Sequence, residues 1–175
     1  TSMLRPGTSF KEVHLTACRT IFEGLKSFGL TRGDTEEAIK AGAHALFFPC
    51  GTGHMLGLDV HDMENLGEQW IGYDGQPKST QFGLKSLRLG KELQPGYVLT
   101  IEPGIYFIPE LIDLWKSENA HTDFLNYQEI ENFRDFGGLR NEEDFVITED
   151  GARRLGKALP LTLEGVEAVR QSNAI

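Results

Sequence analysis

The chain has 175 residues, of which 39% are hydrophobic and 25% are charged, as is typical of a soluble globular protein with one domain. Its formal net charge of -9 leaves no basic patch to neutralise phosphates, which argues against nucleic acid as a partner. There is no apolar run long enough to cross a membrane and no signal-peptide pattern, so no membrane partner is predicted and a cytoplasmic location is expected. Two cysteines, Cys18 and Cys50, are too few for a disulfide framework.

The first predicted element is a helix that begins after Ser9 and ends at Gly29. Ser9 is suited to cap it, with Glu12 at the capping-box position. Its apolar residues recur at spacings of three and four and predict one buried face: Phe10, Val13, Ala17, Ile21, Leu25 and Phe28. His14 and Glu23 lie off this stripe and are predicted to be solvated, whereas Cys18 is expected to be a small buried apolar residue.

The rest of the chain mixes strand and helix patterns without an internal repeat or a linker, so residues 1–175 are predicted to form one unit. The predicted elements are a short helix over 34–43, short strands and glycine bends over 45–60, a strand over 98–101 that continues at 106–108, a helix within 109–134, a strand over 144–148 and a closing helix over 163–171. Residues 63–94 are polar and rich in glycine, which is typical of loops.

A pair of histidines stands in a glycine-rich segment, Pro-Cys-Gly-Thr-Gly-His-Met-Leu-Gly-Leu-Asp-Val-His-Asp at 49–62. In one straight strand His54 and His61 would point to opposite faces. A bend at Gly57, or a loop between short strands, would aim both rings into one cavity. Because imidazole is a common metal ligand and titrates near neutral pH, the pair is interpreted as a functional site.

Two acidic residues follow or precede predicted strands. Glu102 directly follows the apolar strand and precedes Pro-Gly, where a buried carboxylate costs several kcal/mol unless it is paired or bound to a metal. The alternative is an acid that reaches solvent at the strand end. Glu142 precedes the next strand, and Arg140 shares its face if the chain is extended, which would let the guanidinium orient the carboxylate.

One histidine and two glutamates suit a divalent ion such as Mn²⁺, Zn²⁺ or Co²⁺. Two adjacent ions would need more ligands than His54, Glu102 and Glu142 supply. The residues therefore indicate metal-assisted hydrolysis with an incomplete ligand set.

Three segments resemble the Xaa-Pro dipeptidases (prolidases) of the pita-bread metallopeptidase family, which also contains aminopeptidase P, creatinase and methionine aminopeptidase. They are Gly-Thr-Gly-His-Met-Leu-Gly-Leu-Asp-Val-His-Asp at 51–62, Leu-Gln-Pro-Gly-Tyr-Val-Leu-Thr-Ile-Glu-Pro-Gly-Ile-Tyr-Phe at 93–107 and Phe-Gly-Gly-Leu-Arg-Asn-Glu-Glu-Asp-Phe-Val-Ile-Thr at 136–148. They occur in the family's order and span most of the chain. The resemblance implies an α+β pita-bread fold and a site for two divalent ions, usually manganese.

By position, the resemblance assigns His54, Glu102 and Glu142 as metal ligands. It implies that Glu102 also acts as general base, and that His61 contacts substrate and stabilises the tetrahedral intermediate. Arg88 matches an arginine that holds the carboxylate of a dipeptide, a task that suits a guanidinium.

Two departures from the family pattern are expected to matter. The two aspartate ligands lie upstream of the matching region, so the chain is expected to be the C-terminal half of the catalytic domain, with the N-terminal half of the same protein as its partner. Cys50 stands where many relatives carry a substrate-side histidine, and a thiol is a poorer hydrogen-bond donor.

The resulting hypothesis is hydrolysis of the bond preceding proline, with Xaa-Pro dipeptides as the favoured substrates and a homodimer as the expected assembly. One alternative is an Xaa-Pro aminopeptidase that acts on longer peptides. Another is a non-catalytic binding module with a peptidase-like fold. The isolated chain is expected to bind at most one metal ion weakly and to hydrolyse nothing measurable.

Overall fold

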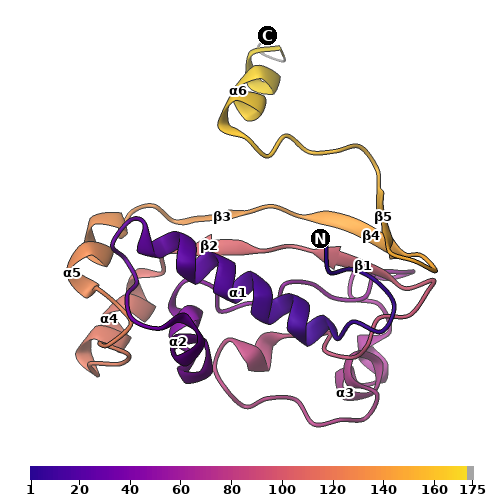
Figure 1. The fold of residues 1–175 in the computed structure, drawn as a ribbon, viewed down its shortest axis with the longest axis horizontal. Coiled ribbons are helices and arrows are strands. Elements are labelled where there is room, and N and C mark those ends of the chain that lie inside the picture. The colour runs from indigo at the N-terminus through magenta and orange to yellow at the C-terminus, as the bar shows by residue number, and fades with distance from the viewer. Residues whose placement is uncertain (173–175) are drawn as a thin grey trace.

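The computed structural model describes residues 1–172, which form two small antiparallel sheets flanked by helices (Figure 1). One sheet has the strand order β1-β4-β5 and the other pairs β2 with β3. The helices and strands are α1 (Phe10–Lys26), α2 (Thr35–Ala41), η1 (Ala43–Leu46), η2 (Glu64–Leu66), α3 (Glu68–Tyr73), η3 (Leu84–Ser86), β1 (Val98–Ile101), β2 (Gly104–Tyr106), α4 (Pro109–Ser117), α5 (Tyr127–Ile130), η4 (Glu131–Phe133), β3 (Gly138–Arg140), β4 (Glu143–Ile147), β5 (Ala152–Leu155) and α6 (Leu163–Ser172), where η denotes a 3₁₀ helix.

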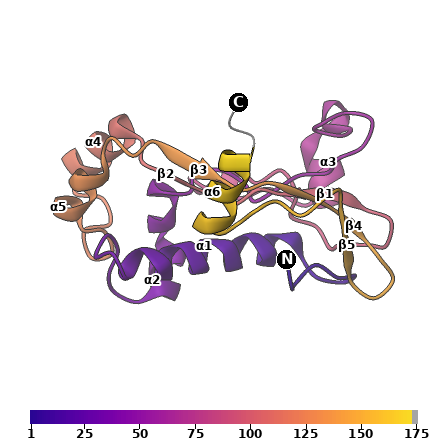
Figure 2. The ribbon, with the colours of Figure 1, turned by 90° about the horizontal axis from the view of Figure 1, so that it is seen from above.

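Helix α1 lies along one face of the strands, and α3 lies on their other side (Figure 2). The predicted helix is confirmed, but its buried face is rotated from the expected one and consists of Phe10, Val13, His14, Cys18, Phe22 and Leu25. His14 is fully buried, and Phe28 is 65% exposed because the helix ends at Lys26. The predictions for these two residues were therefore wrong, whereas Cys18 is buried as expected. Ser9 does not cap the helix, because its hydroxyl donates to the Gly90 carbonyl at 3.1 Å.

The other predicted helices have their counterparts in α2, α4, α5 and α6. Asp34 caps the N-terminus of α2, since its side chain accepts from the Glu37 amide, and Gly42 follows the helix with a φ of 90° that favours glycine. The helix expected within 109–134 is divided between α4 and α5. Helix α6 stands apart from the rest of the fold (Figure 1), and none of its described residues is buried.

Strands β1 and β4 agree with the predicted strands to within one residue. The predicted continuation at 106–108 was wrong, because β2 covers Gly104–Tyr106 and pairs with β3 in the other sheet, and β3 and β5 were not expected. All three residues of β3 and the first three of β5 are exposed, so neither carries an alternating apolar pattern. Pairing with neighbouring strands rather than hydrophobicity fixes them. Likewise, the segment read as a loop contains α3, a helix of six residues in which only Gly72 is buried.

The two ladders share one register. Ile101 pairs with Glu143 in the first sheet, and Gly104 pairs with Arg140 in the second. The pairing of β2 with β3 therefore continues the register of the pairing of β1 with β4, although the two pairs belong to different sheets.

The segment over 45–60 forms η1 and irregular extended chain instead of the expected short strands. It lies beside β1, where the Thr100 amide donates to the His54 carbonyl at 3.0 Å and the Glu102 amide donates to the Thr52 carbonyl at 2.7 Å. Glycine permits this approach, because a Cβ on Gly53 would lie 1.9 Å from the Thr100 carbonyl oxygen. The glycine-rich sequence thus serves close backbone contact.

The buried apolar residues form two clusters that meet at α1. The C-terminal part of α1 contributes Phe22 to a cluster with η1, α4 and α5, and its N-terminal part contributes Phe10 to a cluster with β1 and β4. Among the residues that the structure describes, no helix is both long and apolar enough to span a membrane.

Alanine at Gly53 is expected to destabilise the protein by about 2–3 kcal/mol, because its methyl group would push β1 away from the glycine-rich segment. Gly24→Ala is the matched control, since Gly24 lies on α1 with open space around its Cα and should gain about 0.5–1 kcal/mol. Urea unfolding of the three proteins measures both changes. Equal effects of the two substitutions would contradict the close approach at Gly53.

Candidate metal centre

Six of the seven predicted site residues line one cavity of about 300 Å³. The complete lining is Cys50, Gly51, Gly53, His54, His61, Ser86, Arg88, Glu102 and Arg140. The exception is Glu142, which lies outside this lining. The residues come from the glycine-rich segment, from η3 and the chain after it, and from the ends of β1 and β3, so the fold brings together groups that are far apart in the sequence.

His54 and Glu102 form the buried centre of the site, with exposed fractions of 4% and 8%. Nε2 of His54 lies 3.1 Å from Oε1 of Glu102, and Nδ1 lies 2.9 Å from the Met55 carbonyl. Since a carbonyl only accepts, Nδ1 carries the donated proton and Nε2 faces the carboxylate. The same carboxylate accepts from the Thr100 hydroxyl at 3.1 Å and from Nη1 of Arg140 at 2.8 Å.

These contacts shift both pKa values. Burial by itself lowers the pKa of His54, but the hydrogen bond and charge of Glu102 and the bond to Met55 outweigh it and raise that pKa. Burial by itself raises the pKa of Glu102, but hydrogen bonds from His54 and Thr100 and neighbouring positive charge lower it. Both shifts favour the charged forms of the metal-free pair, an imidazolium beside a carboxylate.

His61 joins this pair from the far side of a bend. Its ring centroid lies 4.4 Å from that of His54 and the two rings are nearly perpendicular, at 86°. The chain between them folds back, because the Asp62 amide donates to the Met55 carbonyl at 3.2 Å. At Gly57 a Cβ would lie 2.5 Å from the Asp62 carboxylate. The predicted bend is confirmed, and with it the convergence of both rings on one cavity.

Arg88 lies at the cavity wall with its guanidinium paired to Glu64, and its side chain is 41% exposed. Cys50 is half-buried and belongs to the same cavity lining. Sequence reasoning missed Glu64 and the lining residue Ser86, because both stand in polar chain without periodicity. Only the folded loops connect them with the site.

Arg140 and Glu142 lie on the chain that enters β4. Arg140 donates to Glu102 through Nη1 and to the Tyr106 hydroxyl at 2.7 Å through Nε, so its guanidinium is held by these two residues rather than directed to Glu142. Glu142 is exposed between β3 and β4, and the common register of the ladders places it opposite Glu102. Like charges directly opposite each other are destabilising, which a cation held between them would relieve.

Comparison with known proteins places this site in a family. Residues 1–149 match the model of metallopeptidase family M24, and the chain belongs to this family. It is 41% identical over 165 residues to the Xaa-Pro dipeptidase of Homo sapiens, and the matched region covers 94% of this chain and 32% of that protein. It is also 39% identical over 150 residues to a probable Xaa-Pro aminopeptidase of Botryotinia fuckeliana, covering 86% of this chain and 31% of that protein.

Solved structures agree with this assignment. Proline aminopeptidase P II from Yersinia pestis is similar with a TM-score of 0.67 and 33% identity, over 98% of this chain and 31% of that chain. A zinc-substituted aminopeptidase P of E. coli in complex with product gives the same TM-score at 34% identity, over 97% of this chain and 30% of that chain. The predicted α+β pita-bread fold is thereby confirmed, and the chain spans about a third of the length of these relatives.

In metal-free protein, Glu102→Gln is expected to move the pKa of His54 from above its ordinary value of 6.5 to below it, because burial remains while the negative charge is lost. Chemical shifts of the ring protons of His54 over a pH titration measure this change. Glu149→Gln, in the exposed turn after β4, is the control and should leave the titration unchanged.

The sign of the linkage follows from the two shifts. Because the pKa of His54 is raised in the folded protein, this residue stabilises the fold below pH 6.5, and its contribution is lost as the pH rises through the pKa of the folded state. Because the pKa of Glu102 is lowered in the folded protein, this residue stabilises the fold above pH 4.5, and its contribution is lost as the pH falls through the pKa of the folded state. An unchanged pKa of His54 in Glu102→Gln would contradict the ion pair between the two residues.

Proposed function

We propose that this chain is the C-terminal part of the catalytic domain of a metal-dependent peptidase that cleaves the bond preceding proline, with Xaa-Pro dipeptides as preferred substrates. The observation that carries the proposal is the meeting of His54, His61, Glu102 and Arg88 at one cavity in a member of family M24. The similarity to an Xaa-Pro dipeptidase along nearly the whole chain supports the substrate class. The N-terminal half of the domain is its proposed partner.

The donor set fits a divalent ion. His54 and Glu102 present Nε2 and Oε1 3.1 Å apart, a separation at which both atoms can bind one ion at about 2.0–2.2 Å. Glu142 adds a carboxylate across the ladder. Imidazole with carboxylates suits Mn²⁺, Co²⁺ or Zn²⁺, and the family resemblance favours Mn²⁺ among them. A second ion needs ligands that the N-terminal half would supply. When bound, the two ions would lower the pKa of a shared water and polarise the scissile carbonyl.

The remaining chemistry falls to residues of this chain. Glu102 takes the proton of the attacking water, and Arg140 and Thr100 hold its carboxylate in place for that step. His61 donates to the negative charge that develops on the carbonyl oxygen. Arg88 binds the free carboxylate of the dipeptide, and Cys50 contacts substrate from the same wall.

The pairing of Arg88 with Glu64 gives the runner-up function its support. A substrate carboxylate must compete with Glu64 for the guanidinium, and a longer peptide, which places no carboxylate there, avoids this competition. The similarity to aminopeptidase P structures points the same way. Comparing Gly-Pro with Gly-Pro-Pro as substrates of the whole protein separates the two activities. A homodimer and a cytoplasmic location stay predictions.

Arg88→Ala in the whole protein with Mn²⁺ is expected to raise KM for Gly-Pro by about 10- to 100-fold with a smaller change in kcat, because one charge-assisted contact to the carboxylate is lost. Arg19→Ala is the matched control, since Arg19 lies on α1 with Glu36 as its partner. Steady-state kinetics measure both variants. An unchanged KM for the dipeptide would refute the role given to Arg88.

Glu142→Gln is expected to reduce bound Mn²⁺ and to lower dipeptide hydrolysis by at least about 100-fold, because an amide binds the ion more weakly than a carboxylate. Glu149→Gln removes the same charge at an exposed turn and should retain both properties. Elemental analysis and activity of the whole protein test this, and full occupancy in Glu142→Gln would exclude Glu142 as a ligand. The 175-residue chain alone should hydrolyse nothing measurable.

A further inference from the structure

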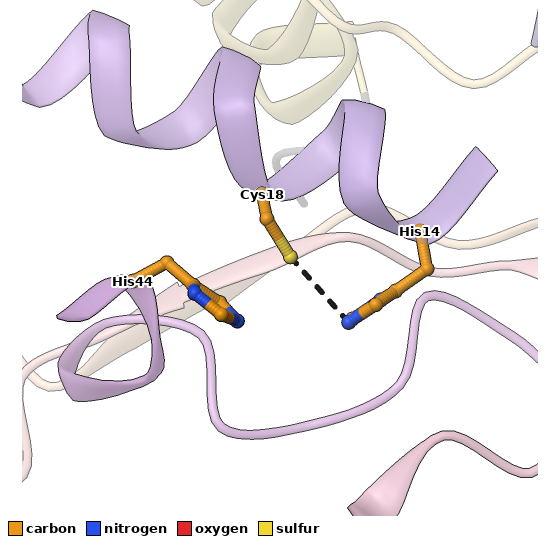
Figure 3. A group of neighbouring side chains, drawn as sticks. All are labelled: His14, Cys18 and His44. Carbon is orange, nitrogen blue, oxygen red and sulfur yellow. Dashed lines mark hydrogen bonds between the residues drawn. The ribbon is translucent and has the colours of Figure 1, made fainter. Parts of the chain in front are cut away.

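A second cluster of potential metal ligands lies beneath α1, outside the cavity described above. His14 and Cys18 are one helical turn apart on α1, and His44 comes from η1. One ligand atom from each residue lies within 4.8 Å of the others, and all three residues are buried. Figure 3 shows the three side chains directed into one space between the two elements.

His44 is the unexplained member of this cluster. It is 1% exposed, and within the described part of the chain both of its ring nitrogens are buried without a hydrogen-bond partner. Leaving such a group unsatisfied costs about 1–3 kcal/mol, which a purely structural residue at this position would avoid. An ion bound to the ring would supply the missing partner.

The ring of His14 has a hydrogen bond at one nitrogen, as metal-bound histidines commonly do. Its Nδ1 lies 2.8 Å from the Thr52 hydroxyl, and its Nε2 lies 3.4 Å from Sγ of Cys18. A hydrogen bond at one nitrogen fixes the ring and leaves the other for the ion. Ligand atoms around one ion with bonds of about 2.1–2.3 Å lie about 3.5 Å apart. His14 and Cys18 already have this spacing, and a ring nitrogen of His44 lies within 4.8 Å of both ligand atoms.

We propose that His14, Cys18 and His44 form a closed binding site for a single thiophilic metal ion, and that this ion is Cu(I). A thiolate with two imidazoles is a soft donor set, which copper and zinc prefer over manganese or calcium. Charge decides between copper and zinc. Cu(I) with one thiolate and two neutral imidazoles has no net charge, whereas Zn²⁺ would leave a positive charge in an apolar core, where it is costly.

The protonation states agree with this charge balance. Burial lowers the pKa of His14 to about 3 and that of His44 to about 4, so both rings are neutral and keep a lone pair for the ion. Burial raises the pKa of Cys18 to about 12, so the ion must displace the thiol proton, which leaves with the buffer. Each ion that binds therefore releases one proton, and no electron transfer is involved.

This site does not depend on the proposed peptidase function. All three ligands belong to this chain and are covered by it, whereas the cavity at His54 is expected to take ligands from another part of the protein. The two sites also differ in donor chemistry, since one offers a thiol and the other carboxylates. Copper binding and peptide hydrolysis can consequently fail independently.

The test is a Cu(I) titration of purified protein in the absence of oxygen, with the coloured Cu(I)–bicinchoninate complex as the probe. Because the ligands are buried, the ion is offered during refolding from urea as well as to folded protein. The wild type is expected to take one Cu(I) per chain from the probe. X-ray absorption should show one sulfur and two nitrogen neighbours.

Cys18→Ala and His44→Leu are expected to weaken Cu(I) binding by at least about 100-fold, more than the loss of an outer-shell partner costs. His44→Leu also removes the two unpartnered nitrogens and keeps an apolar volume, so it should fold, as circular dichroism will verify. Cys50→Ser and His54→Ala are the controls, because these residues line the other cavity, and they should bind as tightly as the wild type.

Loss of binding in Cys50→Ser with retention in Cys18→Ala would place the ion in the other cavity and overturn the proposal. So would a wild-type protein that takes no Cu(I) during refolding. Uptake of Zn²⁺ in place of Cu(I) would overturn the assignment of the ion.

Discussion

The candidate centre depends on one backbone alignment, in which three extended segments lie side by side. The glycine-rich segment bonds to β1 so that His54 is next to Thr100, and β1 bonds to β4 so that Ile101 faces Glu143. Side chains alternate along each segment, so a slip of one residue between the glycine-rich segment and β1 would turn the Glu102 carboxylate away from the imidazole of His54. The absence of a Cβ at Gly53 permits this alignment, because any side chain would collide with the Thr100 carbonyl.

Within this alignment several polar groups surround and hold the Glu102 carboxylate. Its carboxylate accepts from Thr100 and Arg140 and is paired with His54, so a buried charge is fully compensated before any ion binds. Glu142 receives no such support from Arg140, although the register places it directly across from Glu102. The centre is thus preorganised on the side of β1, whereas Glu142 on the side of β4 is exposed.

The cluster under α1 is built in the opposite way. Its three groups are enclosed by the core, and its two imidazoles are kept neutral by burial rather than charged by a carboxylate. The two clusters are neighbours, because Thr52 bonds to the His14 ring through its hydroxyl and to the Glu102 amide through its carbonyl. One short stretch of chain therefore positions a hard-donor site and a soft-donor site on its two sides.

The sequence by itself determined the helices with strong periodicity, strands β1 and β4, the bend that unites His54 and His61, and the family of the fold. These features depend on the spacing of nearby residues and on sequence motifs, and both can be read from a single sequence. The prediction for His14 was wrong, because helical periodicity does not reveal which neighbouring segment will cover a residue outside the apolar face. Strands β3 and β5 were missed, because their exposed residues are held in place only by pairing with other strands. The partners of Arg88 and Arg140 and the approach of His44 to α1 were likewise decided by tertiary structure, since long-range contacts leave no periodic trace in the sequence.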